Sequence, residues 1–146
     1  MYKNILVPTD GSPSALRAAA LAKKFLLAGV TEKVALVHVT SLSKELGLKS
    51  RLMPVAVNEK LVQLVEGAGR EIMEKTRAIF TDDGLEVECL VEFGEPAEAI
   101  VRLARCRHFE LIIMGSWGLN KIKEILMGSV SDQVIRLAKC PVMIVK

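Results

Sequence analysis

Residues 115–131 read GSWGLNKIKEILMGSVS and follow a short apolar run, residues 111–114, whose length and branching are typical of a buried strand. Glycine occurs at positions 115, 118 and 128, and a serine follows the last of them. From Ser129 onward apolar residues recur at helical spacing, so Ser129 is the expected N-cap, with Asp132 in the first turn. The pattern predicts a strand, a glycine turn, a connecting segment and the N-terminus of a helix.

These parts are suited to holding an anion. Glycine lets the backbone adopt positive φ and lets a ligand approach where a Cβ would otherwise stand. The first turn of a helix has unpaired N–H donors and a partial positive charge. The stretch therefore predicts an anion site, most naturally one for phosphate.

Strand and helix patterns alternate through the rest of the chain. The expected strands are Ile5–Val7, Val34–Val39, Glu86–Phe93, Glu110–Met114 and Val142–Val145. Four main helices are expected. The first starts after Ser12, the second runs from about residue 57 to Phe80, the third runs from Glu95 to Cys106, and the fourth starts at Ser129 and ends before Cys140-Pro141. This alternation predicts one doubly wound α/β domain over residues 1–146 with a five-stranded parallel sheet.

Composition agrees with a sheet buried on both faces. Hydrophobic residues make up 51% of the 146 residues and aromatic residues only 4%, which indicates an aliphatic core. The net charge of +3 is small, and Lys and Arg are scattered, so nothing indicates a nucleic-acid partner. The three cysteines have no C-x-x-C spacing and are expected to be buried small hydrophobes in a reducing compartment.

No apolar run approaches the roughly 20 residues that span a bilayer. The first residues lead directly into a strand, with no visible signal peptide. We therefore expect a cytoplasmic protein with no membrane partner.

The candidate site lies where the strands end, because open parallel sheets bind ligands at the carboxyl ends of their strands. The residues at or beside those ends include Pro8, Thr9, Asp10, Val39, Met114 and Gly115. No P-loop, H-E-x-x-H or G-x-S-x-G motif is present, and no metal-ligand cluster is evident. His38 lies in an apolar strand and is expected to be a core histidine rather than a catalytic base, while His108 is expected at the surface.

The spacing G-x2-G-x9-G-S, formed by Gly115, Gly118, Gly128 and Ser129, resembles the nucleotide-binding signature of the universal stress protein family, in its ATP-binding class. The segments YKNILVPTDGS, VALVHV, FGEPAEAIV and CPVMIVK resemble segments of that family in the same order, so the likeness covers nearly the whole chain. The resemblance implies a Rossmann-like fold of the adenine nucleotide alpha hydrolase type, with strand order 3-2-1-4-5.

The resemblance also implies roles for the site residues. Thr9, Asp10 and Val39 would line the adenine and ribose of ATP or another adenine nucleotide. The phosphates would be wrapped by Gly115, Gly118, Gly128 and Ser129, helped by Val130 and Ser131. A divalent cation, Mg²⁺ or Mn²⁺, is expected from the chemistry of the nucleotide. The family's last strand pairs two subunits antiparallel, which implies a homodimer through Val142–Val145.

Each of these residues can also be interpreted as having a role in the fold alone, without a ligand. Asp10 could stabilise the turn after the first strand, Ser129 could act only as an N-cap, and Gly115 and Gly118 could be ordinary turn glycines. The lysines of the same stretch could be solvated or could neutralise phosphate, and Trp117 could contact the ligand or lie at its rim.

Three functions remain open on this basis. The first is a nucleotide-binding regulatory module of the stress response, and the second is an enzyme that hydrolyses ATP slowly or phosphorylates itself. The third is a nucleotide-free protein that acts as a dimer or docking surface. No catalytic residue can be assigned from the sequence.

Overall fold

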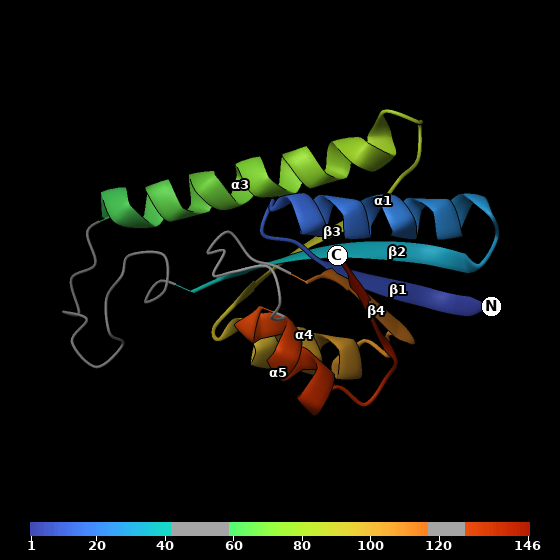
Figure 1. Ribbon diagram of the computed structural model, residues 1–146. Coiled ribbons are helices and arrows are strands. Elements are labelled where there is room, and N and C mark those ends of the chain that lie inside the picture. Colours follow the sequence, from blue (N-terminus) through green and yellow to red (C-terminus); the bar gives the residue numbers. More distant parts are fainter. Residues whose placement is uncertain (42–58, 117–127) are drawn as a thin grey trace.

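Five parallel strands form one sheet in the order β3-β2-β1-β4-β5 in the computed structural model, which describes residues 1–41, 59–116 and 128–146. The strands are β1 (Tyr2–Pro8), β2 (Thr31–Thr40), β3 (Glu88–Phe93), β4 (Leu111–Gly115) and β5 (Val142–Val145). Helices α1 (Pro13–Leu27) and α3 (Glu59–Thr81) cover one face of the sheet, and α4 (Pro96–Cys106) and α5 (Ser129–Leu137) cover the other (Figure 1). The predicted fold class and strand order are confirmed.

The core has two halves, one on each face of the sheet, because successive side chains of a strand point to opposite faces. In β1, Ile5 and Val7 pack in the cluster under α1 and α3, whereas Leu6 between them packs in the cluster under α4 and α5. Both clusters consist mainly of Val, Ile, Leu, Ala and Met, with Phe80 and Phe109 as their buried aromatic residues. The predicted aliphatic core is confirmed.

Helix α1 begins and ends as its sequence predicts. Ser12 is the N-cap, and its hydroxyl accepts a hydrogen bond from the Ala15 N–H at 3.3 Å. Pro13 occupies the first helical position, where a missing N–H has no effect on the helix. Gly29 follows the C-cap with a φ of 69°, which is the left-handed backbone that ends many helices.

The start of α5 differs from the expectation. The N-cap is Gly128 and not Ser129, because the Gly128 carbonyl accepts the first helical hydrogen bond, from the Asp132 N–H at 3.0 Å. Ser129 is thus the first residue inside the helix. At the other end α5 finishes at Leu137, before Cys140-Pro141, and the Leu137 side chain is 46% exposed instead of facing the core.

The expectation of buried cysteines is wrong. All three are free thiols, with Cys89 and Cys106 exposed and Cys140 partly buried. Cys89 lies on β3, which is an edge strand, and Cys106 is the last residue of α4, so neither position is enclosed by other elements. Partial burial still raises the pKa of the Cys89 and Cys140 thiols above the ordinary value.

Within the described ranges, none of the helices is both long and apolar enough to cross a membrane.

Candidate functional site

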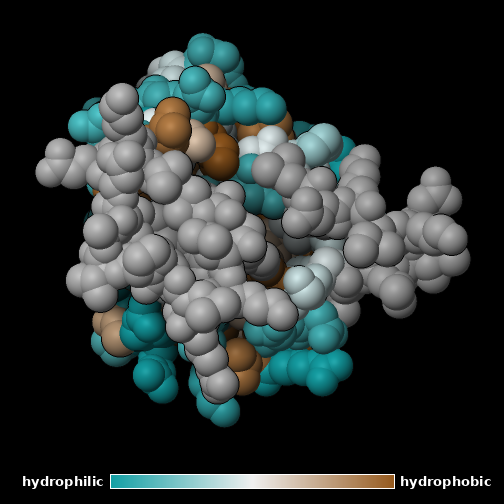
Figure 2. Space-filling view, turned by 90° about the vertical axis from the view of Figure 1, so that its left-hand side faces the viewer, coloured by the Kyte–Doolittle hydropathy of each residue, from teal (hydrophilic) through white to brown (hydrophobic). Residues whose placement is uncertain are grey.

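The carboxyl ends of β1, β2 and β4 lie at one edge of the sheet, on the left of Figure 1. Strand β1 pairs with β2 on one side and with β4 on the other, so the order of the strands reverses between β1 and β4. Such a switch point is where open α/β sheets bind ligands. Figure 2 views the molecule from this side, where hydrophilic and hydrophobic residues are interspersed around the grey atoms.

The structure brings most of the predicted site residues to this edge. Their places are the end of β1 for Pro8, Thr9 and Asp10, the end of β2 for Val39, the end of β4 for Met114 and Gly115, and the start of α5 for Gly128, Ser129, Val130 and Ser131. Gly118 lies outside the described residues, as do Trp117, Lys121 and Lys123.

The turn after β1 is held by short side-chain contacts. The Ser12 N–H donates to Asp10 Oδ1 at 2.9 Å, and the Gly11 N–H donates to Thr9 Oγ1 at 3.2 Å. Gly11 has a φ of 76°, a left-handed backbone that favours glycine. Asp10 therefore does stabilise this turn, as one alternative proposed. Its second carboxylate oxygen makes no hydrogen bond within the described part of the chain, and the side chain is only partly buried.

His38 is part of the core, as expected. It is 4% exposed, and its Nδ1 lies 3.0 Å from the Thr9 carbonyl oxygen. A carbonyl oxygen can only accept, so Nδ1 carries a proton and donates it to Thr9. This bond fixes the imidazole against the backbone of the β1–α1 turn.

Gly115 is required by packing. A Cβ at this position would lie 2.4 Å from Ser14 Oγ and 2.6 Å from the Ala15 backbone nitrogen. The absence of a side chain thus allows the first turn of α1 to approach the end of β4. Gly128 is different, because its φ of −57° and ψ of 151° are open to any residue. The backbone angles of Gly128 thus do not require a glycine.

The N-terminus of α5 is tied to β4 through one carbonyl group. The Ser116 carbonyl oxygen accepts from the Gly128 N–H at 2.6 Å and lies 3.3 Å from Ser131 Oγ. Ser131 Oγ also lies 2.9 Å from the Gly128 carbonyl oxygen, so this buried hydroxyl is occupied by backbone acceptors. The N–H groups at the start of α5 have no partners inside the helix, and they form a positive end beside the switch point.

Comparison with known proteins identifies the family of the chain. A family model described as the universal stress protein family matches residues 1–146. The chain belongs to the universal stress protein family.

Two universal stress proteins from Methanocaldococcus jannaschii are among its relatives. MJ0577 is 36% identical over 156 residues, which cover 100% of this chain and 96% of MJ0577. MJ0531 is 33% identical over 150 residues, which cover 100% of this chain and 83% of MJ0531.

Solved structures of the family have the same fold. The MJ0577 structure has a TM-score of 0.78 at 35% identity and covers 100% of this chain and 96% of its own. A universal stress protein solved in complex with cAMP has a TM-score of 0.70 at 27% identity, with 99% of this chain and 97% of that protein covered.

Two residues of this universal stress protein domain were missed by sequence reasoning. Ser116 lies between predicted site residues, but its importance comes from its carbonyl group, which no side-chain pattern reveals. Thr76 of α3 is fully buried, and its hydroxyl lies 2.8 Å from Thr9 Oγ1. The available signal was a polar residue within the apolar stripe of α3, four residues after Ile72 and four before Phe80.

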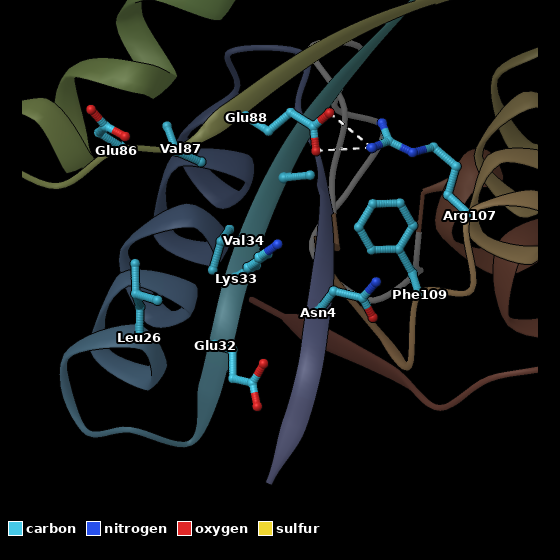
Figure 3. Close-up of a pocket in the computed structure, with 11 residues that line it drawn as sticks. Asn4, Leu26, Glu32, Lys33, Val34, Glu86, Val87, Glu88, Arg107 and Phe109 are labelled. Atoms are coloured by element: carbon cyan, nitrogen blue, oxygen red, sulfur yellow. Dashed lines mark hydrogen bonds and ion pairs between the residues drawn. The ribbon is translucent and has the colours of Figure 1, made fainter.

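A hollow of about 460 Å³ lies elsewhere, at the amino ends of the strands (Figure 3). Its most prominent charged group, Arg107, contacts both carboxylate oxygens of Glu88, at 2.9 and 3.2 Å, and lies over the Phe109 ring. These charges neutralise each other, and the hollow contains none of the predicted site residues. No group of three His, Cys, Asp or Glu side chains placed to hold a metal occurs in the described ranges.

Proposed function

We propose that this universal stress protein binds ATP or another adenine nucleotide at the edge between β1 and β4, and that the nucleotide sets its conformation or its affinity for partners. The observation that carries the proposal is the contact of the Ser116 carbonyl with Gly128 and Ser131, which holds the N-terminus of α5 beside the end of β4. The relative in complex with cAMP supports an adenine nucleotide as the ligand.

The two sides of the site suit the two ends of a nucleotide. The N-terminus of α5 presents N–H donors and a partial positive charge, which favour phosphate. Asp10, at the end of β1, is an acceptor when ionised and suits ribose hydroxyls or the adenine amino group. The backbone angles of Gly128 would also suit other residues, and the absence of a side chain there would let a phosphate approach the helix end.

A divalent cation would be expected from the chemistry of the nucleotide alone, because the described ranges contain no group of three side chains placed to hold a metal. Mg²⁺ usually keeps several waters and binds through one or two carboxylates together with substrate phosphates. The phosphates and waters would supply the ligands of the cation, whereas Asp10 is assigned to the ribose or the adenine. Mg²⁺ or Mn²⁺ would neutralise phosphate charge, while the protein would hold and orient the nucleotide.

A binding role has more support than an enzymatic one. Hydrolysis or phosphoryl transfer needs a positioned base for water or a hydroxyl. His38 donates Nδ1–H to the Thr9 carbonyl and is buried in the core, so it is not placed as that base. Among the described residues, slow ATP hydrolysis or autophosphorylation would then rest on Asp10, and turnover that persists in Asp10→Asn would exclude this role.

We also propose a homodimer through β5, which is the edge strand next to β4. The Pro141 carbonyl accepts from the Ile112 N–H of β4 at 3.0 Å, and the Val145 carbonyl accepts from the Ser116 N–H, just after β4, at 2.9 Å. Backbone groups alternate in direction along a strand, so those of Val142 and Ile144 point away from β4. A second copy could pair with these outward groups without disturbing the sheet.

Calorimetry and thermal unfolding with Mg-ATP and Mg-AMP test nucleotide binding. ATP at about a hundred times its dissociation constant should stabilise the protein by roughly 2.7 kcal/mol and raise the midpoint by roughly 5–10 °C. Gly128→Ala should keep its fold, because its backbone angles suit alanine, but should bind ATP more weakly. Gly67→Ala, on α3 with nothing near its added Cβ, is the matched control and should bind ATP normally.

The outcomes separate the parts of this proposal. No stabilisation of the wild-type protein by any adenine nucleotide would overturn nucleotide binding itself. Full ATP affinity in Gly128→Ala would instead overturn the placement of the phosphates at the N-terminus of α5.

A further inference from the structure

Helix α3 contacts the β1–α1 turn through three residues at helical spacing. Ile72, Lys75 and Thr76 lie three and four positions apart and therefore on one side of the helix. A Cβ added to Gly11 would lie 3.3 Å from Ile72 Cγ1, so the turn packs directly on that side chain. Lys75 Nζ lies 3.5 Å from the Gly11 carbonyl oxygen, at the long end for a hydrogen bond.

The hydroxyl of Thr76 determines the direction of a chain of hydrogen bonds. Thr76 Oγ1 donates to the Ile72 carbonyl oxygen at 2.8 Å, and a hydroxyl has only one proton to donate. In the 2.8 Å contact between Thr76 and Thr9, the donor must then be Thr9 Oγ1. The Thr9 hydroxyl in turn accepts from the Gly11 N–H at 3.2 Å. The buried side chain of α3 thus fixes the backbone of the turn that carries Asp10.

We propose that Thr76 is a positioning residue of the nucleotide site. It acts through Thr9 and Gly11 to hold the β1–α1 turn in the conformation that presents Asp10 to the ligand. This inference rests on the proposed nucleotide binding, because it concerns the same site. It adds a contribution from α3, a helix from which no ligand contact is expected.

The hydroxyl pair could instead serve stability alone, as buried polar groups are normally hydrogen-bonded. The two roles differ in what a substitution changes. If the pair is purely structural, its removal should lower the unfolding midpoint without altering the affinity of the folded protein for ATP. If Thr76 is a positioning residue, removal of its hydroxyl should lower the affinity of the folded protein for ATP, and a residue that restores the hydroxyl should recover this affinity.

Thr76→Val is the decisive variant, because valine has nearly the same shape as threonine and lacks the hydroxyl. We expect calorimetry below the unfolding transition to show ATP binding about three to ten times weaker, the equivalent of one lost hydrogen bond. Thr76→Ser should recover most of the affinity. Thr81→Val, the same change at the exposed end of α3, is the matched control and should bind ATP as the wild-type protein does.

A double-mutant cycle with Asp10→Asn tests the route of the effect. Asparagine keeps an oxygen for the Ser12 N–H but removes the charge. If Thr76 acts by orienting Asp10, Thr76→Val should change the affinity less than twofold in the Asp10→Asn background.

Unchanged affinity in Thr76→Val, or fully additive effects in the cycle, would overturn the inference and leave nucleotide binding intact. A wild-type protein that binds no adenine nucleotide would overturn both.

Discussion

Replacing Gly115 by alanine should destabilise the domain even when no ligand is present. The added Cβ would lie 2.4 Å from Ser14 Oγ, 2.6 Å from the Ala15 nitrogen and 2.6 Å from the Ser14 carbonyl carbon. Ser14 Oγ belongs to a side chain, but the other two atoms belong to the backbone of the first turn of α1. Relief of the contact therefore requires that the whole start of the helix move.

The size of the effect follows from these distances. Non-bonded carbon atoms pack at about 3.5–4.0 Å, so α1 would have to shift from β4 by roughly 1 Å. Overpacking of this kind usually reduces the free energy of unfolding by about 1–3 kcal/mol. For a domain of this length each kcal/mol corresponds to about 2–4 °C, which gives a midpoint lower by roughly 2–12 °C.

Urea unfolding monitored by circular dichroism is a suitable assay, because the midpoint concentration reports stability when the slope is unchanged. The comparison should include Ser14→Ala alone and combined with Gly115→Ala. Removing the hydroxyl leaves both backbone contacts in place, so the Gly115→Ala cost should persist in the double variant. A Gly115→Ala protein as stable as the wild type would refute this reasoning and leave ligand approach as the reason for the glycine. Complete rescue by Ser14→Ala would show instead that the Ser14 hydroxyl, and not the backbone of α1, excludes the Cβ.

Three further predictions concern other parts of the chain. Gly67→Ala should raise the free energy of unfolding by up to about 1 kcal/mol. Gly69→Ala should not raise it, because the added Cβ would lie 3.1 Å from His38 Cδ2. Equal urea midpoints for the two variants would contradict this prediction. Ile144→Pro should lower the mass of the protein measured by sedimentation, because proline removes an N–H that points away from β4. Ile144→Ala keeps that N–H and should leave the mass unchanged. A dimer in both variants would exclude this interface. Partial burial raises the pKa of the Cys89 thiol. Iodoacetamide at pH 8 should therefore alkylate Cys89 more slowly in the folded protein than in denaturant. An equal rate of alkylation would contradict the raised pKa.

The fold could be predicted because its signals are local and repeated. Each buried strand is a short aliphatic run, and each helix has its own spacing and caps, as Ser12 and Gly29 show for α1. Strand ends were less predictable: β2 begins at Thr31 rather than Val34, because pairing with β1 extends it beyond the apolar run. Local patterns determine which element forms, and its neighbours determine where it stops.

The details of the site could not be predicted, because they depend on contacts between distant residues. Thr9 and Thr76 are 67 positions apart, and neither has a neighbour in sequence that indicates the pairing. The N-cap of α5 was misassigned because serine is a common cap, whereas the capping carbonyl belongs to Gly128, whose N–H is bound by Ser116. The start of α5 is thus determined by a tertiary hydrogen bond and not by the local preference for serine as an N-cap.

The same contacts give a physical reason to favour a regulatory role. The β1–α1 turn is held from the α3 side, through Thr76, whereas the N-terminus of α5 is held from the end of β4, through Ser116. A nucleotide that contacted both Asp10 and this helix end would touch elements from opposite faces of the sheet. Its binding energy would then depend on how those elements are placed, so nucleotide and partner affinities would be linked reciprocally. That linkage requires no reaction at the phosphates, only a difference in affinity between two arrangements of the same domain.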